Sequence, residues 1–293
     1  MSILLTGATG FIGRHYIEHN PVSRIVVRER CDDLNHIEQH VVEDMSQCPD
    51  DAAMFSGCDT VVYLAGIAHN ALSSASDAQI SQVNHHAVIS FAQRAAKHGI
   101  KRFIFLSSTI VYGVGASALP IDENTPAHPT DAAAMAKYHC ERDLLALSDN
   151  KVIEVVIVRS PLVYGEGVKG NLARLIKLGA RVPVLPFGSS KALRHYIDVK
   201  TLVKALDGFA HYEHVDGETY LVADSEPLSL PRLIDVLLAP ANKTVLHLPV
   251  PVGLFKMAAG LTNNKQMYQL LFNDFALDTK KYTSLLERQQ ADS

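Results

Sequence analysis

Residues 3–13 read ILLTGATGFIG, a short apolar strand pattern that runs directly into glycines at positions 7, 10 and 13. A helical pattern follows these glycines. Glycines at this spacing permit a tight turn and a close approach of the backbone to a ligand, and the N–H groups at the start of the helix suit a pyrophosphate. Because the triplet opens a strand-turn-helix unit, we predict that it binds a dinucleotide and is more than a structural turn.

Apolar, β-branched runs recur along the first half of the chain, with helical segments between them. Strands that read as nearly continuous apolar runs are buried on both faces of a parallel sheet. The sequence therefore predicts an α/β fold with a Rossmann-like, doubly wound parallel sheet, in which residues 1–164 form the dinucleotide-binding domain. The runs lie at residues 3–5, 24–27, 40–42, 60–64, 102–106 and 152–158.

The pattern changes after Gly165, where glycine, proline and asparagine become denser. Short strand patterns at residues 182–186 and 218–222 alternate with helical patterns such as residues 228–238. We predict that residues 165–293 form a smaller C-terminal α/β lobe that binds substrate and completes a cleft, with some crossing of the chain between the lobes.

The composition excludes several classes of partner and location. Lys and Arg number 27 against 31 Asp and Glu, so the net charge of -4 gives no basic footprint for nucleic acid. The four cysteines show no C-x-x-C spacing and are too sparse for a disulfide framework. No apolar run reaches the roughly 18 to 20 residues of a membrane span, and no signal-peptide pattern is present. We expect a cytoplasmic protein that does not bind membranes.

The stretch TGATGFIG resembles the opening of the extended short-chain dehydrogenase/reductase family, which includes nucleotide-sugar epimerases, dehydratases and reductases. Similar motifs extend along most of the chain. The resemblance implies cofactor contacts from the glycine-rich turn, from the segments after the third and fourth strands, and from the start of the next helix. The corresponding residues are Gly7, Thr9, Gly10, Phe11, Ile12, Gly13, Asp44, Leu64, Ala65, Gly66 and Asn84.

Two further stretches are similar to the catalytic segments of this family. FLSSTIVYG, residues 105–113, places Ser108 at the position of the catalytic hydroxyl. HPTDAAAMAKYHCE, residues 128–141, is similar to the helix on which a tyrosine and a lysine four residues later share one face. Lys137 matches that lysine, which also contacts the cofactor, but Ala133 stands at the tyrosine position. In the family the ammonium lowers the pKa of the phenol, so that it exchanges a proton near neutral pH.

Three interpretations of Ala133 remain open. The residue was introduced to silence proton transfer, or the protein naturally lacks the phenol and acts as a binding or sensing module, or Tyr138 replaces it. Alanine is an excellent helix former, so the helix should survive in each case. Tyr138 is adjacent to Lys137 and therefore points about 100° away around the helix, which makes it a poor partner.

The second strand pattern ends with Arg28, where an NAD-specific site usually carries an acidic residue. An arginine there suits the 2′-phosphate of NADP(H), and Arg14 could assist it. Glu29 keeps NAD(H) open. We therefore favour NADP(H) as the cofactor, with NAD(H) as the alternative. The non-functional alternative is that these arginines are exposed and bind no ligand.

Two segments of the second half are similar to those that hold the diphosphate of a nucleotide sugar in the family. VRSPLVYGEGVKGN, residues 158–171, contains Asn171 and Lys169, and LRHYIDV, residues 193–199, contains Arg194. A guanidinium beside helix N-terminal amides suits a pyrophosphate. A structural salt bridge is the alternative role of Arg194.

The combination of VKGN with AGIAH around His69 resembles members that reduce the C4 keto group of UDP-4-keto-6-deoxy-N-acetylhexosamines in surface-polysaccharide biosynthesis. Substrate contacts are then expected from Ser108, Thr109, His69, Asn171 and Arg194. The alternatives are a UDP-sugar 4-epimerase with bound NAD and a non-catalytic dinucleotide-sensing protein. A homodimer through the helices beside the active-site motif is a further expectation from the family.

No metal site is predicted, because no H-x-x-x-H or carboxylate spacing joins the histidines that attract attention near these motifs. These histidines are His69, His85, His86, His128 and His195.

Overall fold

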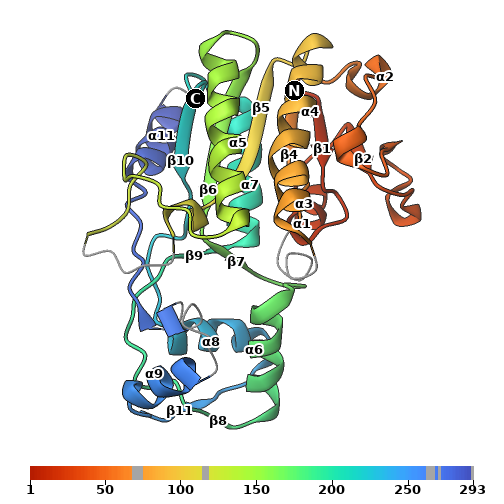
Figure 1. Ribbon diagram of the computed structural model, residues 1–293. Coiled ribbons are helices and arrows are strands. Elements are labelled where there is room, and N and C mark those ends of the chain that lie inside the picture. Colours follow the sequence, from red (N-terminus) through yellow and green to blue (C-terminus); the bar gives the residue numbers. More distant parts are fainter. Residues whose placement is uncertain (68–74, 114–118, 262–267, 270–271, 292–293) are drawn as a thin grey trace.

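The structure is a computed structural model that describes residues 1–67, 75–113, 119–261, 268–269 and 272–291. Figure 1 shows a large domain, in which helices cover a central sheet, above a smaller lobe. Within the described residues, no helix is long and apolar enough to cross a bilayer.

Seven parallel strands form the central sheet in the order β10-β6-β5-β4-β1-β2-β3. This arrangement confirms the predicted doubly wound parallel sheet. The strand order reverses between β1 and β4, and ligands of such sheets bind in the crevice outside the carboxyl ends of the strands at this point. The strands are β1 (Ile3–Thr6), β2 (Arg24–Val27), β3 (Glu38–Val41), β4 (Thr60–Tyr63), β5 (Arg102–Ser108), β6 (Glu154–Ser160) and β10 (Glu218–Leu221).

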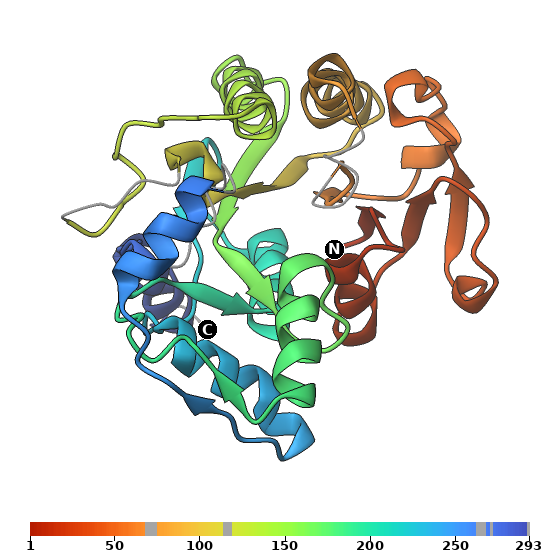
Figure 2. The ribbon, with the colours of Figure 1, turned by 60° about the horizontal axis from the view of Figure 1, so that its bottom comes forward.

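Helices cover both faces of this sheet (Figures 1 and 2). One apolar core joins the sheet to α1 (Phe11–His19), α7 (Val199–His211) and α11 (Lys280–Ala291). The opposite core joins it to α2 (Ala52–Phe55), α4 (Ala87–Lys97) and α5 (Ala132–Asp149). Adjacent β1 residues serve different cores, since Leu5 belongs to the first and Leu4 to the second. A short α3 (Asp77–Ser81) precedes a π-helical turn, Gln82–His86, that leads into α4.

The strand predicted at residues 218–222 forms, but its predicted place in the small lobe is wrong. It is β10, which pairs with β6 at the edge of the central sheet, with Glu218 opposite Val156. Tyr220 packs on Phe209 of α7, while Leu221 packs in a separate cluster on the other side. A strand that is buried on both sides fits a helix-covered sheet, which explains its position.

In the part of the chain that the structure describes, the smaller lobe contains short strand pairs and several helices. β7 (Leu162–Tyr164) pairs with β9 (Tyr196–Asp198), and β8 (Val184–Leu185) pairs with β11 (Leu246–His247). The helices include α6 (Gly170–Arg181), α8 (Leu230–Leu238) and α9 (Val252–Leu261), so the strand and helix predicted at residues 182–186 and 228–238 are confirmed. The predicted domain boundary stays a prediction, because α7, β10 and α11 return to the large domain.

The glycine-rich turn is closely packed at Gly13. An added Cβ there would lie 2.2 Å from the carbonyl oxygen of Gly7 and 2.9 Å from Cα of Ala8. We therefore expect Gly13→Ala to push the turn apart and to lower the free energy of unfolding by about 1–3 kcal/mol, measured by urea denaturation. Gly253→Ala is the matched control, since no heavy atom lies within 4 Å of a Cβ there. Equal stability of the two variants would contradict close packing of the turn.

Candidate functional site

The turn after β1 lies directly against the segment that follows β4. Gly7 has φ +72°, and an added Cβ there would lie 2.8 Å from the amide nitrogen of Ala65. The Thr6 hydroxyl accepts hydrogen bonds from the amides of Leu64 and Ala65, both at 3.1 Å. Gly10 is the N-cap of α1, so the helix begins immediately after the turn. The structure thus brings together two of the segments that the sequence predicts to line a cofactor.

Asn84 joins the same region from the turn before α4. Its buried side chain accepts a hydrogen bond from the Ile67 amide at 2.7 Å and donates one to the Ile67 carbonyl at 3.0 Å. An added Cβ on Gly66 would lie 2.9 Å from Oδ1 of Asn84. The amide of Asn84 therefore holds the backbone after β4 in place.

Ser108 and Lys137 both lie at the carboxyl end of β5, Ser108 as its last residue and Lys137 through a contact from α5. The Lys137 ammonium donates to the carbonyl of Leu106 at 2.8 Å and lies 4.5 Å from the ring centroid of Phe105. Burial lowers the pKa of Lys137. Ala133 lies one turn earlier on α5 and is only partly buried. This arrangement can orient an oxygen and place a positive charge near it, but residue 133 brings no hydroxyl for proton transfer.

Tyr138 packs against apolar side chains, and Thr109 is buried. Tyr138 packs on an apolar cluster that contains Val111 and Phe275. This packing does not support Tyr138 as a replacement for the phenol. Thr109 follows Ser108 directly and is 6% exposed.

A buried network of charged and polar side chains lies next to Ser108 and Lys137. Arg159 and Glu141 form an ion pair at 2.6 Å, and their side chains are 10% and 2% exposed. The Ser107 hydroxyl donates to Glu141, and Arg159 donates to the Tyr112 hydroxyl at 2.6 Å. That hydroxyl in turn donates to the carbonyl of Asp122 at 2.9 Å. Burial raises the pKa of Tyr112 to about 12, which keeps the phenol protonated.

The sequence motifs predict no role for Arg159 or Tyr112. The available signals were an arginine at the end of an apolar strand and a glutamate four residues after Lys137. The network connects β5, β6 and α5, the elements that carry Ser108 and Lys137. It therefore sets where these two side chains lie.

We expect Glu141→Leu to lower the free energy of unfolding by about 3–5 kcal/mol, because it leaves the Arg159 guanidinium buried without its partner. The double variant Glu141→Leu with Arg159→Met should recover much of this loss, since an apolar pair can replace a buried ion pair at little cost. Urea denaturation of both variants measures the difference. A single variant as stable as the double variant would contradict this assignment.

The residues predicted near the adenosine lie after β2 and β3. Arg28 is exposed, and no described residue forms an ion pair with it. Arg14 is already paired with Asp33 and also contacts the Cys31 sulfur at 3.2 Å. Asp44 caps the next turn by accepting from the Ser46 amide at 2.8 Å, and hydrogen bonds from Ser46 lower the pKa of Asp44. Arg28 is therefore better placed than Arg14 to meet a phosphate.

The predicted substrate residues come from separate parts of the chain. Asn171 is exposed in the first turn of α6, for which Lys169 is the N-cap. Arg194 donates to the Asn273 carbonyl at 2.9 Å and lies over the Phe275 ring, 4.9 Å from its centroid. Burial lowers the pKa of Arg194, and no described carboxylate forms a salt bridge with it. The alternative salt-bridge role is thus not observed. His69 lies outside the described residues.

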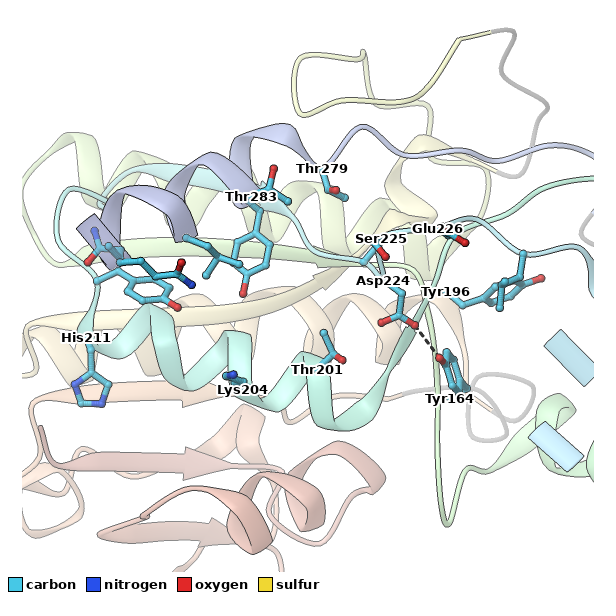
Figure 3. Close-up of a pocket in the computed structure, with 17 residues that line it drawn as sticks. Tyr164, Tyr196, Thr201, Lys204, His211, Asp224, Ser225, Glu226, Thr279 and Thr283 are labelled. Carbon is cyan, nitrogen blue, oxygen red and sulfur yellow. Dashed lines mark hydrogen bonds between the residues drawn. The ribbon is translucent and has the colours of Figure 1, made fainter. Parts of the chain in front are cut away.

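Among the described residues, one cavity contacts the candidate site, and a larger one lies apart from it. One of about 500 Å³ joins Thr9, Gly10 and Phe11 to Glu166 and Lys169, so the glycine-rich turn faces the segment that enters the small lobe. The other, of about 1000 Å³, lies between α7 and α11 (Figure 3). None of the predicted site residues lines the larger cavity. Two of its partly buried polar side chains bind each other, since the Tyr164 hydroxyl donates to Asp224 at 2.8 Å.

The parallel sheet, its strand order and the glycine-rich first turn define a Rossmann-like α/β protein of the dinucleotide-binding class. The family model described as "NAD dependent epimerase/dehydratase family" matches residues 3–223. The chain belongs to this family.

Three relatives show how far the similarity extends. UDP-glucose 4-epimerase of Vibrio cholerae is 28% identical over 287 residues, which span 94% of this chain and 87% of that protein. The solved UDP-glucuronic acid 4-epimerase from Bacillus cereus in complex with NAD aligns at a TM-score of 0.75 and 18% identity, covering 98% of this chain and 92% of that one. RMD from Pseudomonas aeruginosa complexed with NADPH aligns at 0.70 and 18%, covering 97% and 92%. At these identities the two solved structures show the fold.

Proposed function

We propose that the protein binds NADP(H) and a UDP-sugar and has the site of a nucleotide-sugar reductase, with turnover disabled by Ala133. The proposed substrate is a UDP-4-keto-6-deoxy-N-acetylhexosamine of surface-polysaccharide biosynthesis. The observation that carries the proposal is the position of Lys137 and Ser108 at the end of β5, one helical turn from Ala133. The Vibrio cholerae relative named UDP-glucose 4-epimerase supports a UDP-sugar as the substrate class.

Each residue has a separate part in the proposed chemistry. The cofactor, when bound, supplies or accepts a hydride. Ser108 orients the oxygen at sugar C4, and a phenol at position 133 would give that oxygen its proton. Lys137 would lower the pKa of this phenol by its positive charge, and its hydrogen bond to Leu106 holds it in place. A methyl group at residue 133 cannot donate a proton, so reduction stops at this step.

The proposed diphosphate contacts come from the small lobe. Arg194 keeps guanidinium N–H groups that no described carboxylate occupies, and stacking on Phe275 fixes the plane of the group. Such a planar fork suits a pyrophosphate. Lys169 lines the same cavity as the glycine-rich turn and adds positive charge there.

Ala133→Tyr should raise turnover by about 10²–10⁴-fold, the usual contribution of positioned acid-base catalysis. The assay is NADPH oxidation with a UDP-4-keto-6-deoxy-N-acetylhexosamine. Ala133→Phe is the matched control, because it adds the ring without the hydroxyl, and it should stay as slow as the unaltered chain. Equal rates in the Tyr and Phe variants would overturn the proposed role of residue 133.

The same variants separate the alternatives. A UDP-sugar 4-epimerase should retain NAD through purification and interconvert UDP-N-acetylhexosamines once residue 133 is tyrosine. A non-catalytic dinucleotide-sensing protein, which Ala133 itself favours, should bind cofactor without binding UDP. Calorimetric titration of UDP into the cofactor-bound protein decides this point, since absence of binding would remove the UDP-sugar from the proposal.

Arg28→Ala should weaken NADPH binding about tenfold or more, the cost of losing a hydrogen bond to a charged group, and leave NADH binding nearly unchanged. The reason is that Arg28 is exposed after β2 with no carboxylate partner among the described residues. Arg30→Ala removes a second exposed arginine of this loop and is the control. Equal weakening of NADPH and NADH by Arg28→Ala would contradict recognition of the 2′-phosphate.

A further inference from the structure

Helix α1 carries three side chains of metal-ligating type on one face. His15, Glu18 and His19 occupy positions i, i+3 and i+4, which lie on the same side of a helix. Each can bring one ligand atom so that all three atoms lie within 4.8 Å of one another. Nδ1 of His15 already lies 3.4 Å from a carboxylate oxygen of Glu18. Only small side-chain movements are needed to gather them around one ion.

Backbone carbonyls select the tautomers of both histidines. Nε2 of His15 lies 2.8 Å from the carbonyl oxygen of Glu166, and Nδ1 of His19 lies 2.9 Å from the carbonyl oxygen of His15. A carbonyl only accepts, so the facing ring nitrogen must carry the hydrogen. Neutral His15 therefore presents a lone pair at Nδ1, and neutral His19 presents one at Nε2. The same second contact orients the imidazoles that bind metals in proteins.

Nδ1 of His15 lacks a hydrogen-bond partner. His15 is 8% exposed, and its Nδ1 is buried and receives no hydrogen bond. A buried polar atom without a partner costs free energy, and such atoms in native structures call for an explanation. A cation at this point would satisfy it. Glu18 and His19 are exposed, which leaves the site open to solvent.

We propose that His15, Glu18 and His19 bind a divalent cation of the Zn²⁺ class. The ligands are Nδ1 of His15, one carboxylate oxygen of Glu18 and Nε2 of His19, with water completing a four-coordinate shell. Two imidazoles and one carboxylate favour zinc or a similar transition metal over magnesium or calcium, which prefer oxygen ligands.

The position of the site suggests what the ion does. His15 and Glu18 line the 500 Å³ cavity that also contains Thr9 of the glycine-rich turn and Glu166. Glu166 lies shortly after β7, where the chain enters the small lobe, and its carbonyl holds His15. A bound ion would fix the ring of His15 and thereby fasten α1 to this segment. The expected consequence is a more stable junction beside the turn.

The test uses the full chain without a histidine tag and stripped of metal. Co²⁺ is titrated as a spectroscopic probe, and Zn²⁺ binding is measured by calorimetry and by the melting temperature. We expect one site per chain, visible absorption of four-coordinate Co²⁺ that Zn²⁺ removes, and a higher melting temperature with Zn²⁺. His19→Ala and Glu18→Gln change exposed side chains, so the fold should persist, while each should weaken binding at least about tenfold.

His36→Ala is the matched control, since it removes an exposed histidine outside α1 and should leave binding unchanged. Absence of saturable binding to the unaltered chain would overturn the proposal. Binding that His19→Ala and Glu18→Gln leave unchanged would also overturn it, because the ion would then be held by other residues.

Discussion

The buried ion pair between Arg159 and Glu141 is the interaction on which the geometry of the candidate site depends. Both side chains are almost fully excluded from water. A buried charge is tolerated only when it is paired and its remaining hydrogen-bonding capacity is used, which is why Ser107 and Tyr112 join the network. These constraints restrict how β5, β6 and α5 can be arranged.

The network that positions the site is separate from residue 133, which decides whether the site can transfer a proton. Ser107 precedes Ser108, and Glu141 lies one helical turn after Lys137. The network therefore fixes the backbone next to both Ser108 and Lys137. None of its contacts involves residue 133. The position of Ser108 and Lys137 is therefore expected to be the same with alanine or tyrosine at that place.

Strands β1, β2, β4, β5 and β6 could be predicted from the sequence because burial on both faces produces continuous apolar runs. The position of β10 could not, since residues 218–222 carry no local signal for their neighbours, which are decided by packing of Tyr220 on Phe209 and of Leu221 in the cluster with Phe275. The glycine-rich turn could also be predicted, because the spacing of its glycines indicates that backbone segments within the turn approach each other closely. Such local signals carry most of the correctly predicted fold.

Residues whose environment comes from distant segments were harder to interpret. The sequence predicts that Arg14 assists a 2′-phosphate, but this α1 residue is paired with Asp33 in the turn after β2. The partner of Arg159 lies 18 residues away on another element. The stretch HYIEH, residues 15–19, did carry a readable H-x-x-x-H spacing, but the burial of His15 and its contact with Glu166 appear only in three dimensions.

The start of α5 explains why alanine at position 133 is compatible with an intact fold. Asp131 caps the helix by accepting from the Ala134 amide at 2.9 Å, so the first turn does not need a side chain at residue 133. Alanine has the highest helix propensity, and residue 133 is not part of either main apolar core. Loss of a phenol at this point therefore removes a proton donor while costing the helix little.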